Sequence, residues 1–226
     1  MTIPVITIDG PSGSGKGTLA LRLARALGWH YLDSGVLYRA LGLLAQGKAV
    51  DAQAVEKLTE LASNMDLQFK LPAEGPVLIL LEGEDVTQAV RTEKAGEIAS
   101  RVSQHQPVRT ALMALQQRFQ RSPGLVTDGR DMGTVVFPEA PLKIYLDASA
   151  EVRAERRFKQ LHTMGVGVKL PDLVRELKNR DKRDQERAVS PLKPAAGGII
   201  IDTSECSRDV IFDQVLALAV NKGLLA

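Results

Sequence analysis

The segment from Gly10 to Thr18, Gly-Pro-Ser-Gly-Ser-Gly-Lys-Gly-Thr, constrains the fold of this chain more than any other. A β-branched run at residues 4–8 precedes it, and apolar residues then recur at helical spacing until Gly28. This order predicts a strand, a glycine-rich turn and a helix. Glycines let successive backbone N–H groups turn toward one phosphate, and the positive end of the helix adds to the attraction. The segment therefore predicts a P-loop, in which Lys16 reaches the β- and γ-phosphates of a nucleotide.

The residue after Lys16 departs from the usual P-loop pattern. Ser or Thr normally stands there, whereas this chain has Gly17, with the hydroxyl of Thr18 one residue later. The shift weakens the usual direct contact between the hydroxyl and magnesium. We therefore expect Mg²⁺ to be carried with ATP and to be reached through water rather than by a direct protein ligand. The motif predicts phosphate binding and leaves the reaction open.

Four further short apolar runs, each followed by polar or turn residues, predict more buried strands. They lie at residues 30–32, 125–127, 142–146 and 198–201. Together with the run at residues 4–8, they predict an α/β fold with a core of five parallel strands.

Residues 65–86 have a different pattern. Apolar residues alternate with polar ones at positions 67, 69 and 71, and a Gly75-Pro76 turn leads into an apolar run. This pattern predicts a small antiparallel sheet of two or three strands. Flanking helices are predicted near residues 52–64 and 92–121, the second interrupted at Pro107.

Two more loops follow predicted strands. They are residues 32–39, Leu-Asp-Ser-Gly-Val-Leu-Tyr-Arg, and residues 128–134, Asp-Gly-Arg-Asp-Met-Gly-Thr. Because ligands bind beyond the carboxyl ends of strands in an open parallel sheet, we expect these loops to converge with the P-loop. Arg39 and Arg130 would then approach the phosphates. Hydrolysis of a nucleotide needs only one phosphate cradle and a positioned water, so two further arginines predict a second phosphate-bearing substrate.

The segment from Glu151 to Ser190 is rich in cations, with eleven basic residues against seven acidic ones. It holds two sets with the spacing of one helix face, namely Arg153, Arg156 and Arg157, and Arg180, Arg183 and Arg187. Two such helices joined at Gly165-Val166-Gly167 predict a lid that excludes water and stabilises the charge of phosphoryl transfer. We expect Arg153 and Arg157 to contact ATP. With few large apolar residues to pack on, the pair is also predicted to be mobile without ligand.

The composition argues against several other roles. The 29 basic and 27 acidic residues nearly cancel, and four per cent aromatic content gives little material for a nucleic-acid track. No apolar stretch approaches the roughly 20 residues that cross a bilayer. Cys206 is the single cysteine and cannot form an internal disulfide. We expect a cytoplasmic protein without nucleic-acid or membrane partners.

Other uses of a P-loop fit less well. A regulatory GTPase needs an Asn-Lys-x-Asp guanine-binding motif, and Asn221-Lys222-Gly223-Leu224 lacks the final aspartate. The three histidines lack metal-ligand spacing, and transfer between phosphates requires no histidine base. A kinase for another small substrate, such as UMP or a non-nucleotide alcohol, remains open.

Four segments at residues 9–18, 32–39, 128–138 and 180–187, in this order and spacing, closely resemble bacterial cytidylate kinases. The resemblance implies ATP-dependent phosphorylation of CMP or dCMP with Mg²⁺, by in-line transfer on a nucleoside monophosphate kinase fold. The chain is then expected to be one kinase unit over residues 1–226 and a monomer. Its parts are a core at about 1–34, 122–150 and 190–226, a monophosphate-binding insert at 35–121 and a lid at 151–189. The predicted sheet at 65–86 matches the enlarged insert of the bacterial members.

The resemblance also implies roles for individual residues. The P-loop would hold the ATP phosphates through Gly10, Pro11, Ser12, Gly13, Ser14, Gly15, Lys16, Gly17 and Thr18. Arg39, Arg130 and Arg187 would hold the CMP phosphate. Ser34, Ser100, Arg109 and Asp131 would form the cytosine pocket. Arg180 and Asp184 would meet the sugar. Asp128 would orient a magnesium-bound water, and Thr18 could also reach the ion through water. The catalytic set is then Lys16, Arg130, Arg187 and Asp128.

Overall fold

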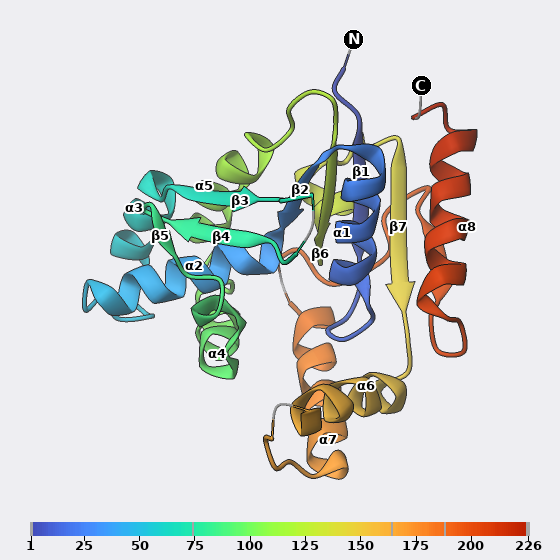
Figure 1. The fold of residues 1–226 in the computed structure, drawn as a ribbon. Coiled ribbons are helices and arrows are strands. Elements are labelled where there is room, and N and C mark those ends of the chain that lie inside the picture. The colour runs from blue at the N-terminus through green and yellow to red at the C-terminus, as the bar shows by residue number, and fades with distance from the viewer. Residues whose placement is uncertain (1, 74, 164, 188, 225–226) are drawn as a thin grey trace. The chain divides into compact units, whose positions relative to one another are not determined.

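The structure is a computed structural model that describes residues 2–73, 75–163, 165–187 and 189–224 (Figure 1). The chain divides into two compact units. The first unit comprises residues 1–3 and 24–127, and the second comprises residues 4–23 and 128–226. The predicted boundaries of core, insert and lid follow a different division and stay predictions.

A five-stranded sheet has the order β2-β6-β1-β7-β8. Its strands are β1 (Val5–Asp9), β2 (His30–Asp33), β6 (Leu125–Gly129), β7 (Leu142–Asp147) and β8 (Ile199–Asp202). β1 pairs in parallel with β7, and β7 with β8. Every residue of β1 and β6 is buried, as expected for central parallel strands covered on both faces. The predicted α/β fold with five parallel strands is confirmed.

The first unit holds the predicted antiparallel insert. β3 (Leu67–Lys70), β4 (Leu78–Leu81) and β5 (Glu84–Asp85) form a three-stranded sheet in that order, with Leu67 opposite Leu81. The helices of this unit are α2 (Ser34–Gly47), α3 (Val55–Asn64), α4 (Glu93–Val102) and α5 (Gln106–Gln117), with a short 3₁₀ turn at Ala89–Arg91.

The predicted helix at 92–121 is interrupted as expected. Its two parts, α4 and α5, separate at residues 103–105, just before Pro107. Pro107 lies in the first turn of α5, where a missing N–H breaks no intrahelical hydrogen bond.

The second unit carries α1 (Lys16–Leu27), which begins there and runs into the first unit, together with α6 (Ala150–Thr163), α7 (Leu170–Gln185) and α8 (Arg208–Asn221). α1 ends before Gly28, whose φ of 64° ends the helix as predicted. Figure 1 shows α8 beside β7, and the α6–α7 pair beyond the carboxyl end of that strand. No helix in the described part of the chain combines the length and apolar character needed to cross a membrane.

The two arginine-bearing helices α6 and α7 share an apolar core of their own. Ala154, Leu161 and Leu173 are buried against one another, and five partly buried side chains pack on them: Phe158, Val168, Leu170, Val174 and Leu177. The expectation that this pair lacks apolar packing is therefore wrong. The leucines and valines lie between the charged positions, so their shared face emerges only when the helices are laid together.

Candidate active site

The glycine-rich loop connects β1 to α1, as the sequence predicts. Gly10 has a φ of 151°, and a Cβ there would lie 2.1 Å from the backbone oxygen of Leu146, so only glycine fits. The Lys16 Nζ donates to the carbonyl of Pro11 at 2.9 Å, and the Ser14 hydroxyl donates to the same carbonyl at 3.1 Å. The loop is thus closed on itself ahead of the helix.

Two side chains from outside the loop hold its carbonyl groups. The Arg153 Nη1 donates to the carbonyl of Ser12 at 3.0 Å, and the Thr203 hydroxyl donates to the carbonyl of Ser14 at 3.2 Å. Both side chains are buried. Because the bonds come from α6 and from the segment after β8, the loop conformation is supported by packing within the second unit.

Arg153, which was expected to contact ATP, is only 3% exposed. Its Nε donates to the carbonyl of Ala148 at 2.8 Å, and its guanidinium pairs with both carboxylate oxygens of Asp181 in α7. Arg153 therefore links the P-loop to α7. A contact between Arg153 and ATP would have to replace or share these protein bonds. The contact with ATP stays a prediction for Arg153 and for the half-buried Arg157.

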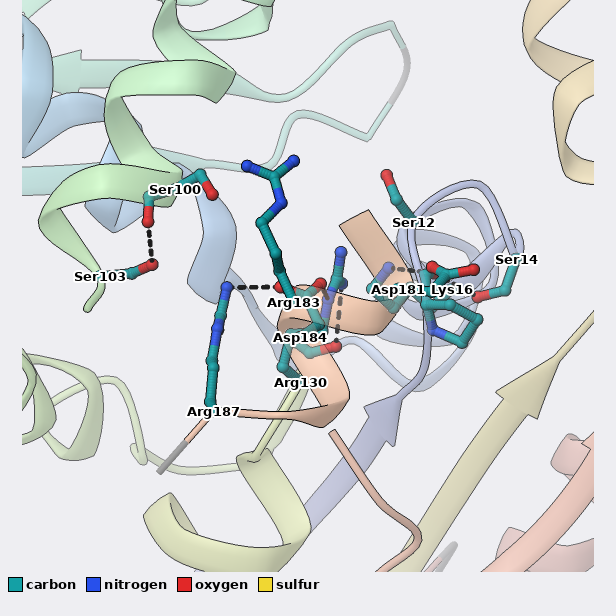
Figure 2. Close-up of polar contacts among 12 residues, drawn as sticks. Ser12, Ser14, Lys16, Ser100, Ser103, Arg130, Asp181, Arg183, Asp184 and Arg187 are labelled. Atoms are coloured by element: carbon teal, nitrogen blue, oxygen red, sulfur yellow. Dashed lines mark hydrogen bonds and ion pairs between the residues drawn. The ribbon is translucent and has the colours of Figure 1, made fainter. Parts of the chain in front are cut away.

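Asp184 in α7 gathers two of the arginines that were predicted to bind phosphate. It accepts a hydrogen bond from the Nε of Arg130 at 2.9 Å, and a second from the Nη2 of Arg187 (Figure 2). Burial raises the pKa of the Asp184 carboxyl. The attraction of Arg130, Arg187 and Arg180 outweighs that effect, so its pKa lies below the ordinary value. The result is an ionised carboxylate that fixes two guanidinium groups.

Arg187 does not share a helix face with Arg180 and Arg183, contrary to its sequence spacing. α7 ends at Gln185, and Arg187 lies beyond the cap residue Glu186. It reaches Asp184 because the chain turns back directly after the helix, which places residues three apart close together. The correction matters because Arg187 is held by Asp184 rather than carried on the helix surface.

Asp9 organises the loop that carries Arg130 and Asp131, a role that sequence reasoning missed. Its carboxylate accepts hydrogen bonds from the backbone N–H of Met132 at 2.9 Å and of Gly133 at 2.8 Å. These amides open a π-helical turn at Met132–Val136. Burial raises the pKa of Asp9 to about 6, against the lowering effect of the two amide bonds. An acidic residue ending a buried strand was the available sequence signal.

The remaining second-unit candidates divide by exposure. Asp128 and Asp131 are buried, at the end of β6 and directly after Arg130, whereas Thr18 is exposed in the first turn of α1. The roles predicted for these three residues toward Mg²⁺ and the cytosine base stay predictions.

The first unit holds the other predicted CMP residues. Ser34 is buried at the start of α2, where Asp33 caps the helix by accepting from the N–H of Val36 at 3.2 Å. The Arg39 Nη1 donates to the carbonyls of Val90 and Thr92 at 2.8 and 3.1 Å.

Arg109 and Ser100 lie on α5 and α4. The Arg109 Nη1 donates to the carbonyl of Ser103 at 3.3 Å, and its guanidinium lies 5.7 Å from the ring centre of Tyr38. The backbone oxygen of Ser100 accepts from the Ser103 hydroxyl at 3.2 Å. Convergence of these first-unit side chains with Arg130 and Asp131 stays a prediction.

A glycine-rich loop on a five-stranded parallel sheet, followed by strand-end arginines, defines a P-loop enzyme of the kinase class. A crystal structure of an uncharacterized protein from Eubacterium ventriosum shares this fold with a TM-score of 0.54, at 11% identity over 96% of this chain and 98% of that one.

Sequence comparison identifies the family. The family model described as cytidylate kinase matches residues 6–221. The cytidylate kinase of Marinomonas sp. (strain MWYL1) is 50% identical over 98% of both chains. That of Aeromonas hydrophila subsp. hydrophila is 52% identical over 96% of this chain and 94% of its own. The chain belongs to the cytidylate kinase family and is a nucleoside monophosphate kinase, a phosphotransferase.

Proposed function

We propose that this chain transfers the γ-phosphoryl group of ATP to the phosphate of CMP or dCMP, giving CDP or dCDP and ADP. The family and the relatives at about 50% identity support this reaction, and nothing among them favours UMP. The structural observation that carries it is the Arg130–Asp184–Arg187 cluster, two cations fixed by one buried carboxylate in the unit that also holds the P-loop. A chain that bound only ATP would not need it.

The chemistry follows from the acceptor. An oxygen of the CMP phosphate attacks the γ-phosphorus of ATP, a new O–P bond forms, and the bond to the β-phosphate oxygen breaks as ADP leaves. A phosphate monoester carries close to two negative charges at neutral pH, so it needs no general base. The barrier is mainly one of bringing anions together in line, which positioned cations lower.

In this reaction the P-loop and Lys16 bind the β- and γ-phosphates, and Arg130 and Arg187 hold the acceptor phosphate. A guanidinium has five N–H donors in a rigid fork, so a bond to Asp184 is compatible with a contact to phosphate. Asp184 is then a positioning residue that sets the direction of both forks. The resemblance implies that Asp184 also meets the sugar of CMP, and the positioning role is additional to that contact.

Mg²⁺ is the expected companion of ATP. Within the described residues, no cluster of three or more His, Cys, Asp or Glu side chains is arranged to hold a metal ion. Mg²⁺ that accompanies a nucleotide keeps several waters and is bound mainly by the phosphates. The exposed Thr18 hydroxyl and the Asp128 carboxylate would hold it through water. When bound, Mg²⁺ neutralises charge on the β- and γ-phosphates.

The action of α6 and α7 as a lid is part of this proposal. The support is that Arg153 and Asp181 tie both helices to the P-loop, so a change in the loop on ATP binding would reach them. A monomeric state is proposed with it from the resemblance, and a cytoplasmic location from the single cysteine, which cannot form an internal disulfide.

The deciding experiment is a coupled assay of ADP production across CMP, dCMP, UMP, AMP, GMP and shikimate. We expect CMP and dCMP to give the highest kcat/KM. Equal or higher kcat/KM with UMP would instead support a broader pyrimidine kinase, and turnover with shikimate alone would overturn the proposal.

A further inference from the structure

A cavity of about 1090 Å³ opens in the first unit, and none of the residues proposed above for ATP or CMP lines it. Its walls come from the end of α1, the start of β2, the strand β3 and the end of α5. Figure 1 shows β3 running toward β2. The volume is slightly above the range typical of small-molecule sites, roughly 300–1,000 Å³.

Aromatic side chains form part of the cavity wall. Trp29 and Tyr31 are buried beneath it. The ring of Phe69 meets Tyr31 edge-on with centroids 6.0 Å apart, and Phe69 meets Phe119 edge-on at 5.5 Å. Phe69 and Phe119 remain partly exposed, so their rings are open to a ligand. Such a surface stacks planar rings with little sequence or substituent preference.

The rim of the same cavity is cationic. Arg25, Lys70, Arg118 and Arg121 line it, and all four are exposed. None of them forms an ion pair with a carboxylate among the residues that the structure describes, whereas other exposed cations do, for example Arg175 with Asp172. Within the described part of the chain, the rim therefore presents positive charge without a carboxylate paired to it.

Asp66 is the one carboxylate among the described lining residues, and its single negative charge leaves the four rim cations in excess. Asp66 accepts from the side-chain amide of Gln68 at 3.1 and 3.3 Å. A ligand that pairs with the rim cations has to be negatively charged, and a ligand that packs on the aromatic wall has to contain a planar ring.

The cavity lies apart from the proposed CMP residues of the same unit. Trp29 and Tyr31 are at the amino end of β2, whereas Ser34 directly follows its carboxyl end. In a parallel sheet the catalytic loops gather at the carboxyl end, so this cavity is a second location.

We propose that this cavity is a binding site for a nucleoside triphosphate outside the catalytic site. The base stacks on one of the Phe69 and Phe119 rings and meets the other edge-on, because the two rings are nearly perpendicular, and the triphosphate is held by the cations of the rim. Four cations on one rim suit a polyphosphate better than a monophosphate, because each phosphate adds a negative charge to be paired.

Trp29 makes the proposal directly measurable. It is the single tryptophan of the chain, so fluorescence excited at the indole band reports on the cavity wall. CTP and ATP would be titrated into protein already saturated with an ATP–CMP bisubstrate analogue, which fills the catalytic site. We expect a saturable fluorescence change with at least one triphosphate. Cytidine, which lacks phosphate, and tripolyphosphate, which lacks a ring, should each bind about tenfold more weakly or worse.

A matched pair of variants separates the rim from general charge. Arg118→Ser with Arg121→Ser removes two rim cations, and Lys48→Ser with Lys57→Ser removes two exposed cations of the same unit that do not line the cavity. The first double variant should weaken triphosphate binding about tenfold or more, and the second should not. Both should retain the circular dichroism spectrum and the CMP kinase rate of the unmodified protein.

Several results would overturn the proposal. They are no saturable signal up to millimolar triphosphate, equal weakening in both double variants, or tripolyphosphate or cytidine binding as tightly as CTP. Because the kinase rate is measured separately, loss of the cavity signal in active enzyme would leave the proposed function standing. A protein that bound triphosphate in the cavity but lacked CMP kinase activity would overturn the proposed function and leave the cavity proposal standing.

Discussion

The carboxylate of Asp184 accepts a hydrogen bond of 2.9 Å from the Nε of Arg130, a residue 54 positions earlier in the chain. The pair joins α7 to the loop after β6, and both side chains are largely shielded from water. With Arg187 on the other carboxylate oxygen, one buried acid fixes the two cations proposed to hold the acceptor phosphate. This relationship connects the stability of the second unit with its chemistry.

The substitution Asp184→Asn should lower both the stability of the protein and its affinity for CMP. Removing one partner of a buried ion pair leaves uncompensated charge, so we expect the free energy of unfolding to fall by about 3 kcal/mol. The KM for CMP should rise while the KM for ATP changes less. Asp172→Asn, which breaks an exposed pair on the same helix, is the control and should change neither value appreciably.

The pH dependence gives this role a second readout. Because the pKa of Asp184 is lowered in the folded state, its stabilising contribution is present above the ordinary carboxyl pKa and lost as pH falls through the lowered value. The stability gap between unmodified protein and Asp184→Asn should therefore shrink in acid. A gap that is independent of pH would argue that the residue acts by shape alone.

Asp9 should show the opposite dependence. Its pKa is raised to about 6 from 3.8, so its contribution to stability is complete below about pH 4 and lost as pH rises through about 6. Relative to Asp9→Asn, the unmodified protein should lose on the order of 3 kcal/mol between those limits. Urea unfolding of both proteins at several pH values measures this. A difference that stays constant would mean that Asp9 is ionised throughout.

Lys16→Ala should lower kcat by roughly 10² to 10³ or more while leaving the fold intact. The lysine is bonded to the loop carbonyl of Pro11 and is only partly buried, so its truncation opens no core cavity. Circular dichroism tests whether the fold is retained, and the coupled assay measures kcat. Substantial turnover in folded variant would show that the loop amides alone bind the phosphates.

Asp131→Ala should collapse the preference for CMP over UMP. Cytosine presents an amino donor beside an N3 acceptor, whereas uracil presents the inverted pair. If both side chains face the base, as the resemblance implies, the Asp131 carboxylate can accept from the amino group and Arg109 can donate to N3, which matches cytosine and not uracil. Discrimination by such a site reaches about 10⁴-fold, and the variant should lose most of it. The CMP-to-UMP ratio of kcat/KM decides, and an unchanged ratio would assign Asp131 to another task.

Hydrogen exchange tests the lid. The amides of α6 and α7 should gain protection when a bisubstrate analogue binds, because ligand phosphates neutralise the arginines. The shared apolar core of Ala154, Leu161 and Leu173 makes the two helices one unit, so they should gain protection together. Equal protection with and without the analogue would mean that the pair is already fixed.

Local patterns were enough to predict much of this protein. The P-loop, the five buried strands and the antiparallel insert each depend on residues close in sequence, whose periodicity and turn chemistry act over a few positions. For the same reason, the sequence correctly predicts that α1 ends before Gly28 and that two arginine-bearing helices follow β7.

Other features depended on contacts between distant residues. Arg153 reaches Ser12, 141 positions away, and Asp9 reaches the amides of Met132 and Gly133, more than 120 positions away. The helical spacing that grouped Arg187 with Arg180 carried no information on where α7 ends. Spacing along a helix indicates which side chains share one face of it. Only tertiary packing decides which charged side chains are buried and which partner each one contacts. The sequence by itself therefore determined the elements and the phosphate-binding chemistry. The tertiary structure alone decided how Asp184, Asp9 and Arg153 hold that chemistry in place, because burial makes an unpaired charge too costly to leave without a partner.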